Sequence, residues 1–218
     1  MIDNVVLTDT HRHTFKDSIT RMQSYCPEMF ARKIPDSMVQ FAFCYQAVLE
    51  LDRSDIRNLT DRDSISILSA GSHEDIATEC LKMDGFSVVG VDPVLNCDLH
   101  TFASRKQRQF NYVVSASVLE HTTDDEEFVA DCCDLLLPGG YGIFTMDYKN
   151  DWSPGQRVPN TSNRFYTEFD LTQRLPKILA TYGCNIYGKQ DYTARDRFNW
   201  EGIDYSFATF VFKKRNKR

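Results

Sequence analysis

The sequence of this 218-residue chain predicts an α/β fold with a mostly parallel sheet. The first observation is the segment 64–93, SISILSAGSHEDIATECLKMDGFSVVGVDP, in which two short aliphatic runs flank an amphipathic stretch. The second is a similar arrangement at 112–146, where two more aliphatic runs flank another amphipathic stretch. A compact strand, helix and strand forms a right-handed parallel crossover. Two such units predict one layered α/β core.

The first unit is defined by its turns. The aliphatic run at 65–68 is too short for a helix and has Ser and Gly beside it, which is typical of a strand buried on both faces. Ser72 and Asp75 have the spacing of a capping box, so we expect a helix from Ser72. Gly85 ends that helix. The run Val88 to Val91 then forms the second strand.

Asp92 lies at the tip of this second strand and indicates a nucleoside ligand. It follows Gly71 by about 20 residues, where a carboxylate can accept both hydroxyls of a ribose. The turn at Gly71 lacks G-x-G-x-x-G, and the next residues include Glu74 and Asp75. Carboxylates at a helix start repel a pyrophosphate but tolerate a ligand with an ammonium and a sulfonium. These features disfavour a dinucleotide.

The remaining elements follow in order. Helices are expected at 15–30 and from Pro35 to Asp52, where apolar residues recur at helical spacing. Thr123 and Glu126 have capping-box spacing, and Pro138-Gly139-Gly140 ends the helix that follows. The last helix is expected at 167–182, and two further strands are expected at 184–192 and 207–212. Only 93–110 separates the second and next strands, which leaves little room for a full helix and a further strand.

Three segments carry a resemblance to a known family. They are ILSAGSHED, the block YVVSASVLEHTTDDEEFVADCCDLLLPGGYGIFTMDY, and RFYTEFDLTQRLPKILATYGCNI. Together they resemble the small-molecule branch of the class I S-adenosylmethionine-dependent methyltransferases, from about Ser64 to the C-terminus. The resemblance implies a Rossmann-like, seven-stranded, mostly parallel sheet with a C-terminal antiparallel hairpin and an N-terminal helical cap. It also implies S-adenosylmethionine as cofactor and methyl transfer to a small molecule.

The same resemblance implies a set of cofactor-binding residues at the strand tips. Asp98 stands near the position where the family often places an acidic residue against the adenine amine, although it could equally cap a turn. Only Gly71 matches the family's glycine-rich loop. The full set is Ser69, Ala70, Gly71, Ser72, Asp92, Pro93, Asp98, Ser117 and Val118.

The candidate catalytic residues follow the later strands. A hydroxyl acceptor must lose its proton, and His121 is the best-placed base because an imidazole titrates near pH ~6.5. Glu120 or Asp147 could orient the imidazole. In the family such a Glu-His pair often only supports the cofactor loop, so both roles of His121 remain open.

Four residues are candidates for binding the acceptor. Trp152 could stack on a sugar or aromatic ring, and Arg157 could hold a carboxylate or phosphate, from the long polar segment 149–165. Tyr148 follows Asp147, and Tyr45 lies in the N-terminal helices that cover the cofactor in the family. All four could instead be ordinary packing or surface residues. We expect a hydroxyl oxygen as acceptor, possibly in a sugar or glycan precursor.

Two regions are expected, an N-terminal arm and helical cap at 1–60 and a methyltransferase core at 61–218. Residues 1–14 are polar and are expected to be loosely held. The charged segment 52–63 separates the two regions.

Composition excludes several classes of protein. A net charge of -6 disfavours nucleic acid as a partner, and no apolar run is long enough to span a membrane. The polar first 20 residues predict no signal peptide, and seven cysteines, an odd number, favour a reduced cytoplasmic protein. No metal site is expected. The strongest alternative function is a methyltransferase-like binding or scaffold protein without catalysis, because the loop around Gly71 is degenerate.

Overall fold

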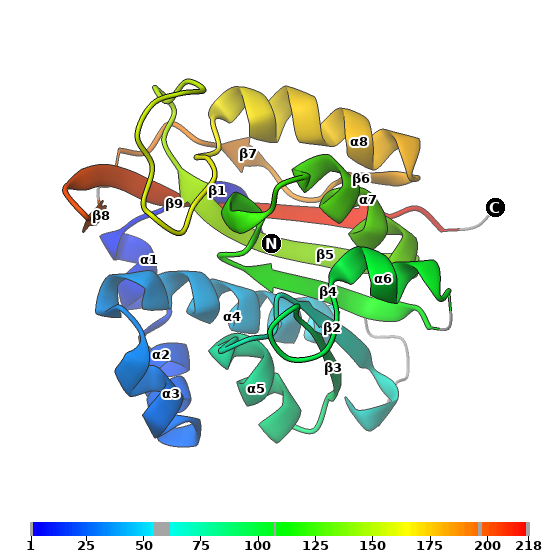
Figure 1. The fold of residues 1–218 in the computed structure, drawn as a ribbon. Helices are drawn as coiled ribbons and strands as arrows, with labels where there is room; N and C mark the ends of the chain where they lie inside the picture. The colour runs from blue at the N-terminus through cyan, green and yellow to red at the C-terminus, as the bar shows by residue number, and fades with distance from the viewer. Residues whose placement is uncertain (1, 55–61, 107, 196–197, 217–218) are drawn as a thin grey trace.

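Four parallel strands form one half of the sheet. The computed structural model describes residues 2–54, 62–106, 108–195 and 198–216. The four strands are β2 (Ser66–Ala70), β3 (Ser87–Val91), β4 (Phe110–Ala116) and β5 (Leu136–Tyr148). β2 pairs in parallel with β3 and β4, and β4 pairs in parallel with β5. All four therefore end at the same edge of the sheet (Figure 1).

The long strand β9 (Ile203–Lys214) runs antiparallel to β5 and continues the sheet. The sheet order is β3-β2-β4-β5-β9-β1-β7, and β6 (Cys184–Ile186) and β8 (Phe198–Trp200) also pair antiparallel with β9. This confirms the predicted mixed sheet and its antiparallel C-terminal strands. β7 (Gln190–Asp191) leaves the predicted hairpin and pairs with β1 instead.

The expectation that residues 1–14 are loosely held is wrong. Asn4–Leu7 form strand β1, which pairs antiparallel with β9. Val6 is fully buried, and the side chain of Asn4 bonds the backbone of Tyr187 and Val211. A four-residue strand is too short to show an alternating pattern, so its pairing comes from tertiary contacts. The predicted boundary between regions, at residues 60 and 61, lies outside the described residues.

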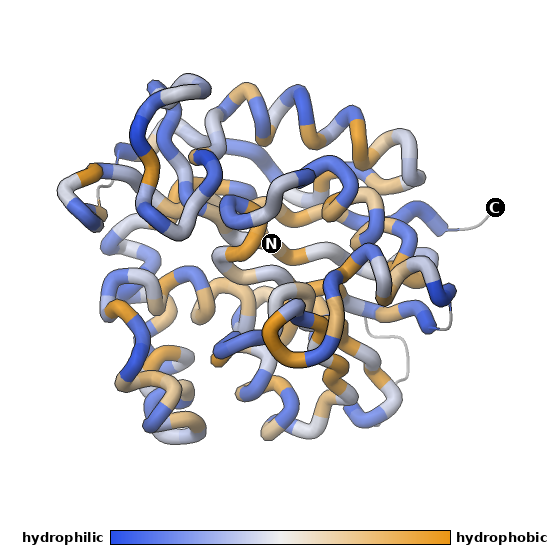
Figure 2. The backbone as a smooth tube through the Cα atoms, viewed as in Figure 1, coloured by the Kyte–Doolittle hydropathy of each residue, from blue (hydrophilic) through white to orange (hydrophobic). Residues whose placement is uncertain are grey.

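Helices cover both faces of the sheet (Figure 1). One face carries the N-terminal helices and the helix after β2, and the other carries the helices after β3, β4 and β5. In Figure 2 the strands between these layers are largely apolar and the outward helix surfaces are hydrophilic. The bounds are α1 (Asp9–Thr14), α2 (Lys16–Tyr25), α3 (Pro27–Arg32), α4 (Met38–Ser54), α5 (Ile76–Met83), α6 (Leu99–Ser104), α7 (Asp125–Leu135) and α8 (Leu175–Thr181).

Shorter helical turns complete the path of the chain. They are the 3₁₀ turns η1 (Pro35–Ser37), η2 (Arg62–Ser64) and η3 (Leu119–His121) and the π-helical turn η4 (Asp170–Arg174) before α8. Within the described part of the chain, α6 is the one regular element between β3 and β4, in line with the short spacing of 93–110.

Both capping-box predictions are wrong by a few residues. Asp75 itself caps α5, because its carboxylate accepts the N–H groups of Ala77 and Thr78. Asp124 caps α7 by accepting the N–H of Glu127. Asp75 accepts two of the free N–H groups at the start of α5, and Asp124 accepts one at the start of α7. These aspartates hold the capping positions predicted for Ser72 and Thr123.

Within the described ranges, no helix combines the length and apolarity needed to cross a membrane. The same residues include no group of three or more His, Cys, Asp or Glu side chains placed to hold a metal ion.

Candidate active site

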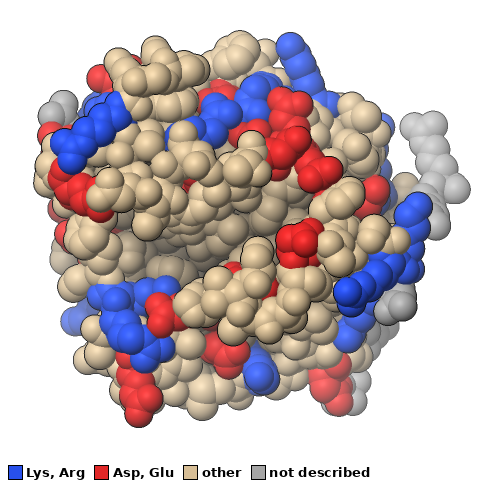
Figure 3. Space-filling view, viewed as in Figure 1, with Lys and Arg blue, Asp and Glu red and all other residues tan. Residues whose placement is uncertain are grey.

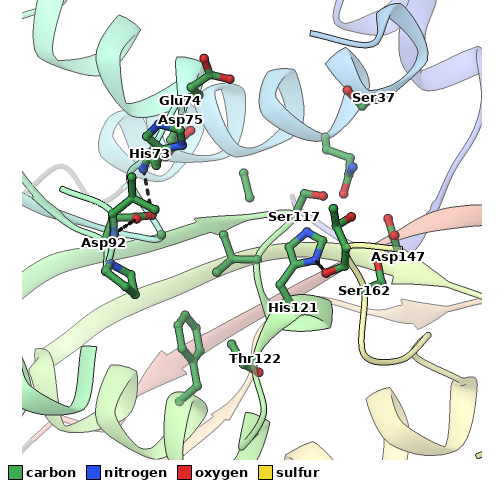
Figure 4. Close-up of a pocket in the computed structure, with 18 of the residues that line it drawn as sticks. Ser37, His73, Glu74, Asp75, Asp92, Ser117, His121, Thr122, Asp147 and Ser162 are labelled. Atoms are coloured by element: carbon green, nitrogen blue, oxygen red, sulfur yellow. Dashed lines mark hydrogen bonds between the residues drawn. The ribbon is translucent and has the colours of Figure 1, made fainter. Parts of the chain in front are cut away.

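A cavity of about 890 Å³ lies at the carboxyl ends of the parallel strands. Figure 3 shows the hollow across this face of the molecule, and Figure 4 shows its lining. Asp92 and His73 lie on one side of the close-up, and Ser117, His121, Asp147 and Ser162 lie on the other. This is the edge at which open α/β sheets bind their ligands.

Asp92 is held at the tip of β3 with its carboxylate in the cavity wall. Its Oδ2 accepts the backbone N–H of His73 at 3.0 Å, and its Oδ1 accepts that of Val94 at 2.8 Å. A carboxylate offers about four acceptor positions, so each oxygen can accept a further bond. Asp92 can therefore hold the two hydroxyls of a ribose, as the sequence predicts.

Gly71 shapes the turn beside Asp92. Its φ is +87°, and a Cβ built on it would overlap the Cγ2 atom of Val118. Both residues line the cavity. Glycine is required here for two reasons, because its backbone is left-handed and because Val118 lies where a side chain would be.

The other residues predicted at this turn have structural contacts. Ser69 is buried and donates to Asp75 Oδ2 at 2.8 Å. Ala70 is buried, and the hydroxyl of Ser72 lies against Gly90. None of these three residues lines the cavity. Their side chains support the turn from behind, and contact of these three residues with a cofactor stays a prediction.

Asp98 lines the cavity and also caps α6. Its two carboxylate oxygens accept the backbone N–H and the hydroxyl of Thr101, each at 2.8 Å. Two roles were predicted for Asp98, contact with adenine and capping, and the structure shows the capping role. Pro93, also predicted to bind the cofactor, lines the cavity between Asp92 and Asp98.

Ser117 leaves β4 in a strained conformation. Its φ is +57°, which is rare for a residue other than glycine, and its hydroxyl donates to Glu120 Oε1 at 2.7 Å. This turn directs the chain from the sheet edge into η3 and brings His121 to the cavity. Backbone strain of this kind concentrates at functional sites.

The imidazole of His121 is fixed by its Nδ1 atom. Nδ1 lies 2.7 Å from the carbonyl oxygen of Thr161, which can only accept, so Nδ1 carries the proton. In the neutral ring Nε2 then keeps its lone pair, and it lies 4.0 Å from Glu120 Oε1. This tautomer is the one that a general base requires.

Glu120 and Asp147 form a buried carboxyl pair. Glu120 is fully buried, and its Oε2 has no hydrogen-bond donor among the described residues. Burial raises the pKa of both groups, and the charge of Glu120 further raises that of Asp147, while a bond from Ser162 lowers it. Two neighbouring buried carboxyls avoid repulsion by sharing one proton. We therefore expect the pair to keep a proton at a higher pH than an ordinary carboxyl would.

Two of the predicted acceptor contacts are buried elsewhere. Tyr45 donates its hydroxyl to Asp84 at 2.6 Å, under the N-terminal helices. Tyr148 stacks on Tyr192 and bonds its carbonyl at 3.4 Å. Neither residue lines the cavity. Both hydroxyls have partners within the core, and an acceptor contact by either residue stays a prediction.

The two predicted contacts from the long loop also lie outside the cavity. The ring of Trp152 packs edge-on against Phe165, with the centroids 6.4 Å apart. Arg157 donates to the carbonyl of Glu201 at 2.9 Å. The loop lines the cavity through Pro159, Thr161 and Ser162 instead.

The cavity also has an aromatic wall that the sequence did not identify. Phe198 and Trp200 stack with their rings at 10° and 6.5 Å between centroids, and Tyr205 and Phe207 pack against Phe198. All four line the cavity. They belong to β8 and β9, and only Phe207 lies in a strand that the sequence predicted.

Comparison with known proteins identifies the domain. A family model described as a methyltransferase domain matches residues 45–187, more than half of the chain. The human mitochondrial ubiquinone biosynthesis O-methyltransferase is 30% identical over 112 residues, which are 41% of this chain and 30% of that protein. A probable S-adenosylmethionine-dependent methyltransferase of Mycolicibacterium smegmatis is 32% identical over 74 residues, 34% of this chain and 28% of that protein. The matches thus span less than a third of each curated relative.

Solved structures share the fold at low identity. The 1,6-didemethyltoxoflavin-N1-methyltransferase of Burkholderia thailandensis, solved with S-adenosylhomocysteine, has a TM-score of 0.54 and 15% identity, covering 92% of this chain and 89% of that one. The magnesium protoporphyrin IX methyltransferase of Synechocystis has a TM-score of 0.51 and 14% identity, covering 91% and 99%. These similarities establish the architecture.

Proposed function

Because this chain belongs to the methyltransferase-domain family, we propose that it transfers a methyl group from S-adenosylmethionine to a hydroxyl oxygen of a small molecule. The observation that carries the proposal is one cavity with Asp92 on one side and His121 on the other (Figure 4). Such a cavity can hold a nucleoside and an acceptor together. Holding two reactants in line can supply about 7–11 kcal/mol of the barrier.

The residues present fit the proposed cofactor. Asp92 has acceptor positions free for the ribose, and Gly71 leaves the strand tips open beside Val118. Ser117 and Pro93 also line the cavity. S-adenosylmethionine, when bound, supplies a methyl group on a positively charged sulfur. Asp98, which already caps α6, remains a proposed neighbour of the adenine.

His121 is proposed to take the proton of the acceptor hydroxyl at Nε2. The bond from Nδ1 to Thr161 fixes the ring while this happens. Glu120 Oε1 lies 4.0 Å from Nε2, so the negative charge of the carboxyl pair stabilises the imidazolium that forms. Glu120 and Asp147 therefore act through His121. This assigns the base role over the loop-supporting role left open by the sequence.

The acceptor class rests on two observations. The human relative is named as an O-methyltransferase, which supports an oxygen acceptor. The wall of Phe198, Trp200, Tyr205 and Phe207 favours a flat ring over a highly hydroxylated sugar. The sugar acceptor suggested by the sequence stays a prediction.

A methyl-transfer assay tests the proposal against the alternative of an inactive binding protein. Purified protein is incubated with methyl-labelled S-adenosylmethionine and a panel of hydroxylated ring compounds and sugars. Transfer to a hydroxyl, lost in His121→Asn, is the expected result. Binding of the cofactor with no transfer to any compound would favour the inactive protein.

A further inference from the structure

Gln40 is a buried polar residue whose side chain lacks a hydrogen-bond partner in the described part of the chain. It lines the cavity from α4 and is fully buried. Its amide nitrogen and oxygen both lack a hydrogen-bond partner among the described residues. A buried amide without partners is destabilising, and such groups in native proteins call for an explanation. A ligand group in the cavity would satisfy both atoms.

Gln40 faces the end of β5 at which Asp147 lies. Cys44, one helical turn after Gln40, has its Sγ 4.0 Å from Thr145 Oγ1. Asp147 is two residues beyond Thr145 and on the same face of the strand. One helical turn and two strand residues cover similar distances, about 5.4 and 6.8 Å. Both Gln40 and Asp147 line the cavity beyond the Cys44 contact.

The electrostatics of the cavity disfavour an anion. Its lining contains two cationic side chains among the described residues, Arg32 and Lys33, and both pair with Glu74. Its carboxylates are more numerous, namely Glu74, Asp75, Asp92, Asp98, Asp124, Glu127, Asp131 and Asp147. In Figure 3 basic residues lie at the lower left of the hollow, and both acidic and basic residues lie along its upper edge. A second negative charge near Asp147 would be repelled.

We propose that Gln40 and the Glu120–Asp147 pair form a subsite that binds an uncharged hydrogen-bonding group of the methyl acceptor and rejects a carboxylate at that position. The inference rests on the proposed function. The amide of Gln40 supplies two donors and an acceptor, which suits a carboxamide or a hydroxyl.

Two matched probes test this subsite. They are 2-hydroxybenzamide and 2-hydroxybenzoate, which have the same ring and hydroxyl and differ in charge. Each is titrated by calorimetry into full-length protein saturated with S-adenosylhomocysteine, and each is assayed for methyl transfer. The amide is expected to bind about tenfold more tightly than the carboxylate, because like charges in a buried site are strongly unfavourable.

Variants distinguish the contribution of the Gln40 amide from that of the charge on the Glu120–Asp147 pair. Gln40→Leu is expected to weaken binding of 2-hydroxybenzamide by about tenfold. The matched control is Gln46→Leu on the same helix, since Gln46 bonds Ser18 and Glu50 and does not line the cavity. Glu120→Gln or Asp147→Asn alone leaves one negative charge. The double variant removes it, so only the double variant should erase the preference for the amide over the carboxylate.

Other outcomes overturn the inference in defined ways. Equal or tighter binding of 2-hydroxybenzoate would contradict the subsite, as would binding of neither probe to protein that binds S-adenosylhomocysteine. In both cases the proposed methyl transfer would stand. Failure to bind S-adenosylhomocysteine would instead remove the proposed function itself.

Discussion

A side chain on Gly71 would occupy the space that Val118 fills. The two residues come from adjacent strands, β2 and β4, and their contact closes the turn beneath the proposed nucleoside site. The turn therefore depends on a glycine whose φ is +87°.

Gly71→Ala is expected to weaken S-adenosylhomocysteine binding by tenfold or more, about 1.4 kcal/mol, because Val118 must move into the cavity. Calorimetry measures the affinity. Gly155→Ala is the matched control, since Gly155 has φ +90° but open space around its Cβ and does not line the cavity. Both variants carry similar backbone strain. Equal losses of affinity in the two would show that strain alone, and not the Val118 contact, is responsible.

His121→Asn separates a base from a loop support. Asparagine can place an N–H near the position of Nδ1 and keep the bond to Thr161, but it has no counterpart of Nε2. Turnover is expected to fall by about 100-fold or more, with S-adenosylhomocysteine affinity retained. Steady-state kinetics and calorimetry measure the two quantities. Full turnover in this variant would assign His121 to loop support.

The shared proton of Glu120 and Asp147 predicts a pH dependence of stability. Burial, followed by the charge of Glu120, raises the pKa of Asp147, so the folded pair holds a proton that the unfolded chain has released above about pH 5. A raised carboxyl pKa makes the free energy of unfolding fall as pH rises, by about 1.4 kcal/mol per pH unit, until the folded pair loses its proton.

Asp147→Asn should remove this slope between the unfolded pKa and the folded one. Urea unfolding of wild type and variant from pH 5 to pH 8 measures the difference between the two curves, in which contributions from histidines cancel. Asp17→Asn, at an exposed position, is the control. Parallel curves for wild type and Asp147→Asn would mean that the pair holds no extra proton.

Arg174 joins the start of α7 to the last helix behind the site. It bonds Asp125 Oδ2 and Asp170 Oδ1, each at 2.6 Å, and both carboxylates are buried. Arg174→Met leaves them short of a partner, so the free energy of unfolding should fall by about 3 kcal/mol at pH 7. Arg105→Met, at an exposed position, should change it little. A loss no larger than that of Arg105→Met would show that the remaining partners, such as Arg164, suffice.

The ion pairs of Arg174 with Asp125 and Asp170 also determine how the stability of the fold changes in acid. Burial alone would raise the pKa of Asp125 and Asp170, but their bonds to Arg174 and other partners lower it. Lowered carboxyl pKa values stabilise the fold above the unfolded value of about 4, and this stability is lost as the pH falls below it. The wild-type stability from this cluster should therefore decline below pH ~4, and Arg174→Met should show a smaller decline.

Local sequence patterns predicted the parallel half of the sheet, α4 and the Asp92 tip, because long apolar periodicity and turn residues encode them directly. Patterns failed for β1, which is held by pairing with a strand some 200 residues later. The residues of the candidate site show the same difference between local patterns and tertiary contacts. Residues at strand ends, such as Asp92, His121 and Asp147, were found from their position in the chain.

The acceptor wall could not be predicted in this way, because it depends on which loops fold over the cavity. Trp152 and Trp200 both lie in polar, aromatic-containing segments, and only the tertiary fold decides that Trp200 lines the cavity. Gln40 carried a weak signal, a polar residue within an otherwise apolar stretch of helix at 38–45. Its importance emerges only from its missing partners.

Calorimetric titration of S-adenosylmethionine into wild type and Asp92→Ala tests the central claim most directly. Wild type should bind one equivalent in the micromolar range, and Asp92→Ala should show no measurable binding while remaining folded. Equal affinity in the two proteins would contradict the placement of the nucleoside at the tip of β3, and an absence of binding to wild type would contradict the assigned cofactor.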